Sequence, residues 1–171
     1  SQLVRNDNAF PRVYLVDQYK VVPDRQQIYP LVLQGSEDLR TLVYLEEEPA
    51  IVIDSNSSDQ DSAWITSKTS DAVSVAIRTS ANKLLIMTDT WFDAWQVTVD
   101  GQPSKALRAY GALRAVAVPA GAKEVRFEYH SDRYAVGKLI TGLTFFYLLC
   151  VLGFYLVADL RKRKHTTENK K

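Results

Sequence analysis

The chain has 171 residues, with 21 Lys or Arg against 20 Asp or Glu, so its formal net charge at pH 7 is +1. This balance provides no basic face for a nucleic-acid partner. One Cys excludes an intramolecular disulfide, and one Cys with two His cannot form an ordinary zinc site, so we expect no metal and no cofactor in this segment.

Residues 1–53 predict a small α/β portion packed on the remainder of the domain. Residues 10–16 (FPRVYLV) and 39–45 (LRTLVYL) are short runs rich in Val, Leu and Tyr, with turn or polar residues around them, which favours strands. Between them, residues 24–33 carry apolar side chains at helical spacing. Pro30 limits this segment to a short or broken helix.

Residues 63–134 predict a β-sandwich, which follows a polar, turn-forming linker at 54–62 (DSNSSDQDS). Strand patterns recur about every ten residues, a spacing typical of a jelly-roll or immunoglobulin-like sandwich. They lie at 63–68, 72–79, 83–89, 95–99, 104–108, 113–118 and 124–129. Asp100 and Gly101 fit a type I′ hairpin turn, because both central residues of that turn need positive φ. A calcium contact by the linker aspartates is the alternative to a solvated linker.

Residues 135–160 predict one transmembrane helix, because positions 139–158 (LITGLTFFYLLCVLGFYLVA) carry no formal charge. At about 1.5 Å per residue, this uncharged stretch spans roughly 30 Å, the thickness of the hydrocarbon core of a bilayer. Twelve of its twenty residues are Leu, Ile, Val or Phe, which favours insertion by about 4 to 7 kcal/mol. Tyr134 and Tyr155 near its ends fit interfacial anchors. A buried helix of a soluble fold is the alternative.

Residues 161–171 form a basic tail that predicts the orientation of the helix. The positive-inside rule counts most strongly the four residues just past the span, Arg161, Lys162, Arg163 and Lys164. We therefore expect a cytoplasmic C-terminus and an extracytoplasmic sandwich; the same four residues are also able to bind anionic lipid headgroups. Export of the sandwich needs a cleaved signal or earlier membrane helices upstream of Ser1, and we favour earlier helices.

Several short motifs resemble, in order and spacing, those of one known family. They are residues 9–14 (AFPRVY), 42–46 (LVYLE), 89–95 (DTWFDAW) running into 99–101 (VDG), 113–121 (LRAVAVPAG) and 125–129 (VRFEY), followed by the apolar helix. The set resembles the C-terminal end of the bacterial YfhO-type membrane proteins, which are polytopic and similar to the GT-C class of lipid-phosphate-sugar-dependent glycosyltransferases. One departure is that Asp93 and Ala94 stand where the family has Pro-Gly before the second Trp.

The resemblance implies that the chain is the tail of a multi-pass cell-membrane protein that transfers sugar from a lipid-linked donor to a cell-envelope polymer. Its partners would be the lipid bilayer, upstream transmembrane helices of the same protein, and an envelope glycan or lipid-linked sugar. The family's catalytic carboxylate lies upstream of Ser1, so we expect no catalytic residue in this segment. The alternative is a single-pass, non-enzymatic sandwich module that binds glycans or a protein partner.

Trp91 and Phe92 are the candidate glycan contacts, because exposed aromatic faces stack on sugar rings. They lie in the predicted connection between two strands. Core packing or covering of the core is the alternative role for both. Trp95 differs, since it alternates with Val97 and Val99 on one strand face and is predicted as a core residue.

Overall fold

The computed structural model describes the backbone of residues 9–55, 58, 60–130 and 132–168, and within the last range it describes the side chains of residues 134 and 136–155 only. The chain forms two compact units, Ser1–His130 and Ser131–Lys171. In the described residues, the first unit contains eleven strands and the helix α1, and the second contains the helix α2.

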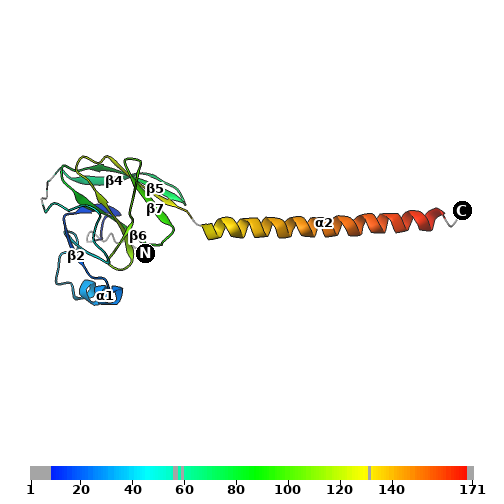
Figure 1. Ribbon diagram of the computed structural model, residues 1–171, viewed down its shortest axis with the longest axis horizontal. Helices are drawn as coiled ribbons and strands as arrows, with labels where there is room; N and C mark the ends of the chain where they lie inside the picture. The colour runs from blue at the N-terminus through cyan, green and yellow to red at the C-terminus, as the bar shows by residue number, and fades with distance from the viewer. Residues whose placement is uncertain (1–8, 56–57, 59, 131, 169–171) are drawn as a thin grey trace, which may run out of the picture. The chain divides into compact units, whose positions relative to one another are not determined.

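The strands form two sheets (Figure 1). The first sheet has the order β1 (Val13–Val16), β6 (Lys83–Thr90), β10 (Leu113–Val118), β9 (Leu107–Ala109), β3 (Leu42–Leu45) and β2 (Gln18–Val21). The second has the order β4 (Ser62–Lys68), β5 (Ala72–Arg78), β11 (Glu124–Tyr129), β7 (Trp95–Val99) and β8 (Gln102–Ser104). Among the described pairings, β2 with β3 is parallel and the others are antiparallel. The predicted mainly β fold is confirmed.

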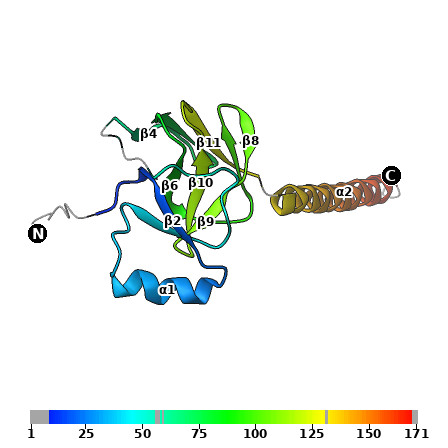
Figure 2. The ribbon, with the colours of Figure 1, turned by 60° about the vertical axis from the view of Figure 1, so that its left-hand side comes forward.

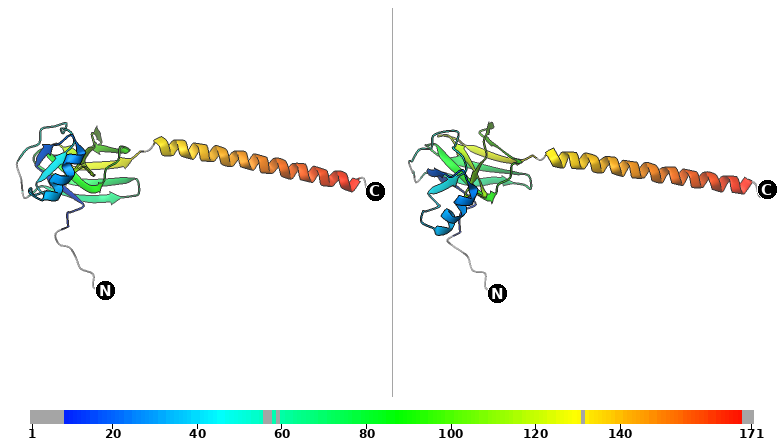
Figure 3. Two further views of the ribbon diagram at one scale, coloured as in Figure 1. Left: turned by 90° about the horizontal axis from the view of Figure 1, so that it is seen from below. Right: turned by 60° about the horizontal axis from the view of Figure 1, so that its bottom comes forward.

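One hydrophobic core lies between the two sheets. Leu85 and Met87 of β6 belong to the same buried cluster as Val75 of β5 and Phe127 of β11. Because residues i and i+2 of a strand point to the same face, this cluster takes the inward face of each sheet. The two sheets therefore pack as a sandwich, whose strands Figure 3 shows from two further directions.

A second core covers the opposite face of the first sheet. Leu84 and Ile86 of β6 cluster there with Ile28 of α1, and Figure 2 shows α1 alongside the strands. The first sheet is thus buried on both faces, which explains the nearly continuous apolar runs of β6 and β10. Since β1 pairs with β6 and β3 with β9, residues before and after the polar segment 54–62 share one sheet.

The short helix predicted in the front portion is α1 (Arg25–Gln34), and it continues through Pro30 without a break. The side chain of Asp24 caps it by accepting a hydrogen bond from the backbone N–H of Gln26 at 2.9 Å. Gly35 ends it with a φ of +62°. Pro30 removes one hydrogen bond, to the carbonyl of Gln26 in the exposed first turn, where water can replace the missing donor. The helix connects β2 to the parallel strand β3.

Two features of the strand pattern differ from the prediction. The single strand predicted at 104–108 is wrong, because β8 and β9 divide this stretch between the two sheets. Strand β8 forms a hairpin with β7, and Ser104 is its last paired residue. After Ser104 the chain crosses to the first sheet. In addition, β2 has no counterpart among the predicted strands, since its exposed and half-buried residues at a sheet edge give little apolar signal. The predicted turn is confirmed, with φ of +49° at Asp100 and +79° at Gly101.

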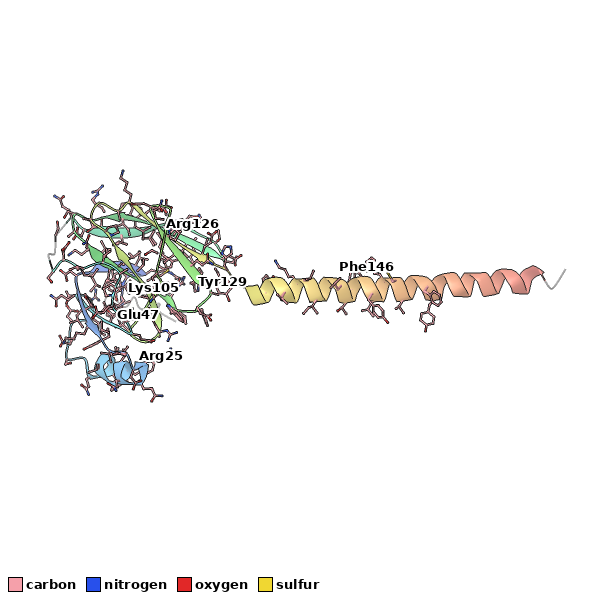
Figure 4. All side chains as sticks on the ribbon, in the orientation of Figure 1. Arg25, Glu47, Lys105, Arg126, Tyr129 and Phe146 are labelled. Carbon is pink, nitrogen blue, oxygen red and sulfur yellow. The ribbon has the colours of Figure 1, made fainter. Side chains whose placement is uncertain are left out.

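The second unit is α2 (Asp132–Glu168), in which Val136–Tyr155 form a candidate membrane span. This stretch has 20 residues and a mean hydropathy of 1.8, and none of its residues is buried in the described structure. Phe146, labelled in Figure 4, is one of these exposed apolar residues. The hydroxyls of Thr141 and Thr144 donate to carbonyls one turn earlier, so the helix satisfies their hydrogen-bonding needs internally. Length and composition therefore fit a bilayer-crossing helix.

Candidate functional site

A groove with a volume of about 490 Å³ opens at one end of the β-sandwich. Segments of both sheets form it: the connection between β4 and β5, the ends of β6 and β11, and the beginnings of β7 and β10. It is lined by three aromatic side chains, Phe92, Trp95 and Tyr129, and by five polar ones, Ser70, Asp71, Asp89, Thr90 and Arg114. We refer to these eight residues as the aromatic groove.

The aromatic side of the groove is built by strand pairing and a turn. Trp95 begins β7, and Tyr129, which is labelled in Figure 4, ends β11; the register places the two residues directly opposite each other. Their ring centroids lie 5.3 Å apart with an angle of 69° between the ring planes, a favourable edge-to-face arrangement. The backbone N–H of Trp95 donates to the carbonyl of Phe92, which closes the turn before β7. Phe92 is 56% exposed, so it offers a ring to a ligand.

Arg114 forms the inner end of the groove, where it is only 3% exposed. Opposite the step from Leu113 to Arg114, β6 runs from Thr90 to Met87, which marks a bulge in β6, a feature that redirects side chains. The guanidinium carbon lies 3.9 Å from the ring centroid of Trp95. Nη2 lies 3.2 Å from Oδ2 of Asp89, whereas Nε and Nη1 have no hydrogen-bond partner among the described residues. Arg114 therefore packs against Trp95 and leaves two donors unsatisfied.

Asp89 links two guanidinium groups. Its Oδ1 accepts a hydrogen bond from Nη2 of Arg12 at 2.7 Å, while its Oδ2 faces Arg114. Burial lowers the pKa of Arg114; the Asp89 carboxylate opposes this shift, and the positive charge of Arg12 adds to it. Arg114 stays charged at neutral pH, because a guanidinium is too weak an acid to lose its proton in a protein. The inner end of the groove is thus an ion cluster.

The strand pattern explains why these charges lie inside the sandwich. Arg114 shares a strand face with Val116 and Val118, which belong to the core between the sheets. Asp89 likewise follows Met87 on the inward face of β6. Asp89 and Arg114 were not among the predicted site residues. The sequence signal that identifies them is a charged residue at a position that continues the apolar face of a strand.

Of the predicted glycan contacts, Phe92 lines the groove and Trp91 does not. Trp91 is half-buried, and the guanidinium carbon of Arg108 lies 3.8 Å from its ring centroid. Arg108 is held in turn by Glu46 at 3.1 Å. The indole Nε1 of Trp91 is buried and has no hydrogen-bond partner among the described residues. Trp95, predicted as a core residue, packs against the core between the sheets and also lines the groove.

The predicted membrane-interface residues lie on α2. Tyr134 and Tyr155 are 67% and 68% exposed and stand near the two ends of the candidate span. Lys138 lies with its Nζ 4.7 Å from the ring centroid of Tyr134. The four basic residues predicted to set the orientation belong to α2, but their side chains lie outside the described residues: Arg161, Lys162, Arg163 and Lys164.

A second charged cluster lies inside the sandwich. Nζ of Lys83, which is 2% exposed, lies 3.6 Å from Asp17 and 3.8 Å from Asp61. Lys83 begins β6 in the first sheet, and Asp61 precedes β4 in the second, so this contact ties the two sheets together. No group of three or more His, Cys, Asp or Glu is placed to hold a metal ion within the described part of the chain. Of the predicted calcium contacts, Asp59 lies outside that part.

The β-sandwich is followed by an apolar helix of bilayer-spanning length, and this combination fits a membrane protein. The family of the bacterial membrane protein YfhO matches residues 43–141, which is more than half of the chain. The chain therefore belongs to the YfhO family. The matched stretch includes every residue of the aromatic groove. Comparison with curated proteins and with solved structures gave no match.

Proposed function

We propose that this chain is the non-catalytic extracytoplasmic domain and last membrane helix of a GT-C-like glycosyltransferase, and that its aromatic groove holds the glycan acceptor. The whole protein would transfer sugar from a lipid-linked donor to a cell-envelope polymer. Membership of the YfhO family supports the membrane part of this proposal. The observation that carries the acceptor role is the gathering of three aromatic rings with carboxylate and hydroxyl groups in one open groove.

The chemistry of the groove suits a sugar. One face of a pyranose ring presents C–H groups that pack on an aromatic ring, and its hydroxyls pair with carboxylates and hydroxyls. Phe92, Trp95 and Tyr129 supply the rings, and Asp71 supplies the carboxylate. A volume of about 490 Å³ falls within the usual range for ligand sites, about 300–1,000 Å³. The groove thus supplies position, while bond breaking belongs to other parts of the whole protein.

The proposed orientation follows from charge at the end of the helix. The basic residues 161–164 begin three residues after the end of the apolar stretch at 158, and the positive-inside rule assigns such an end to the cytoplasm. The sandwich, which precedes the same helix, then faces the cell envelope. This is the side on which an envelope polymer would reach the groove.

The test compares two exposed aromatic residues in the full-length protein. Phe92 (56% exposed) lines the groove, whereas Trp64 (47% exposed) lies on β4 and outside it. Loss of one aromatic contact, about 1 kcal/mol, weakens acceptor binding about fivefold. We therefore expect Phe92→Ala to lower the sugar content of the purified envelope polymer at unchanged protein abundance, and Trp64→Ala to leave it unchanged. Unchanged glycosylation after deletion of residues 1–134 would contradict the proposal.

A further inference from the structure

The charged groups at the aromatic groove compensate one another. Three lining residues carry formal charges: Asp71, Asp89 and Arg114. Arg12 joins them through its ion pair with Asp89, so these four side chains sum to zero. Both carboxylate oxygens of Asp89 are already engaged, one by each guanidinium. The groove therefore has no excess positive charge to attract an anionic ligand.

Arg114 is not arranged as an anion receptor. Recognition of a phosphate or carboxylate by arginine needs N–H groups that point at the anion. Here Nη2 faces Asp89, and Nε and Nη1 are buried away from solvent. The guanidinium lies 3.9 Å from the Trp95 ring centroid and packs against that ring. Arg114 therefore acts as a positioning residue that fixes the orientation of the Trp95 ring.

Asp71 is the charged residue of the groove whose side chain remains available to a ligand. It lies in the connection between β4 and β5, where its backbone carbonyl accepts a hydrogen bond from the N–H of Tyr129 at 2.7 Å. Asp71 is exposed, and its carboxylate has no hydrogen-bond or ion-pair partner among the described residues. A free carboxylate accepts hydrogen bonds from sugar hydroxyls and repels other anions.

We propose that the aromatic groove binds an uncharged sugar residue and rejects the phosphate and carboxylate groups of an envelope polymer. This inference rests on the proposed function and adds the chemical class of the bound unit. The sugar packs its C–H face on Phe92, Trp95 or Tyr129 and donates hydroxyl hydrogen bonds to Asp71. The aromatic rings thus select for the shape of a sugar ring, and Asp71 selects against negative charge.

The test uses two probes with the same sugar backbone, one anionic and one neutral: tetragalacturonate and its fully methyl-esterified form. Maltotetraose and N-acetylchitotetraose are added as further neutral probes. The whole chain is held in lipid nanodiscs at physiological salt, and affinity is measured by saturation-transfer difference NMR. We expect neutral probes to bind and the ester to bind at least about tenfold more tightly than the acid, as expected for repulsion between partly exposed like charges.

Two variants separate the inference from the proposed function. Asp71→Asn should bring the affinities of acid and ester to within about threefold, whereas Glu124→Gln, an equal charge change at the start of β11 and outside the groove, should leave the difference unchanged. Phe92→Ala should weaken every probe. If the acid binds as tightly as the ester, and Phe92→Ala abolishes both, the inference is overturned and the proposed function stands. If no probe binds, or Phe92→Ala leaves binding unchanged, both are overturned.

Discussion

Replacement of Arg114 by Met separates a role in ligand binding from a role in stability. The substitution removes the stacking on Trp95 at 3.9 Å and the ion pair with Asp89 at 3.2 Å. A desolvated cation–π contact contributes about 1–2 kcal/mol, and a hydrogen bond to a charged group about 1.5–3 kcal/mol. The substitution therefore removes about 3–5 kcal/mol of favourable interaction.

Two features of the site reduce the loss of stability that the Arg114→Met substitution causes. Nε and Nη1 of Arg114 are buried without a hydrogen-bond partner among the described residues, and each such donor costs about 1–3 kcal/mol. Asp89 also keeps its ion pair with Arg12 at 2.7 Å, so its charge is not left alone by the substitution. The opposing effects are of equal size, and we expect the free energy of unfolding to change by less than about 2 kcal/mol.

Urea unfolding of the whole chain in detergent micelles, followed by tryptophan fluorescence, measures this change. Titration with a neutral oligosaccharide measures binding, which we expect to weaken at least about fivefold, because Trp95 loses the group that fixes its ring. The Arg114→Lys variant should bind the oligosaccharide as weakly as Arg114→Met, because the ammonium group of lysine is not planar and cannot stack on the Trp95 ring. A decrease of more than about 4 kcal/mol in the free energy of unfolding, with unchanged affinity for the oligosaccharide, would refute this reasoning. Arg114 would then have a structural role only.

Three further substitutions test the fold of the sandwich. Lys83→Met should lower the free energy of unfolding by about 3–5 kcal/mol, because it removes the cation beside Asp17 and Asp61, and addition of Asp17→Asn with Asp61→Asn should restore most of the loss in urea titrations. Trp91→Ala should lower it by about 2 kcal/mol, yet leave oligosaccharide affinity within about twofold, since Trp91 does not line the groove. Gly101→Val should lower the thermal midpoint measured by circular dichroism, because φ at that position is +79°.

Strand positions were predictable where one strand face is buried against the core. Residues 124–129 coincide with β11, because its buried residues alternate with more exposed ones along the strand. Residues 113–118 coincide with β10, which is buried on both faces and shows instead as a short, nearly continuous apolar run. The failure at 104–108 has a physical cause: the chain changes sheets within this stretch, and the choice of pairing partner is not encoded locally. The front helix was predictable from the helical spacing of its apolar residues.

The groove was only partly predictable. Phe92 stood out as an aromatic residue in a connection between strands, and it lies in the groove. Trp95 and Tyr129 come together through the pairing of β7 with β11, two strands that are distant in sequence, so their contact was not predictable from local pattern. Asp89 and Arg114 carry a readable signal, a charge that continues an apolar strand face, and extending the alternation argument to the strand ends identifies them.

The most direct test of glycan contact follows the indole N–H signals of the three tryptophans, Trp64, Trp91 and Trp95, by NMR. The chain in nanodiscs is titrated with a neutral oligosaccharide until the signals stop changing. A saturable shift of the Trp95 signal, with those of Trp64 and Trp91 unmoved, is the predicted result, because Trp95 alone among them lines the groove. A shift confined to Trp64, or no shift at saturating sugar, would contradict the account.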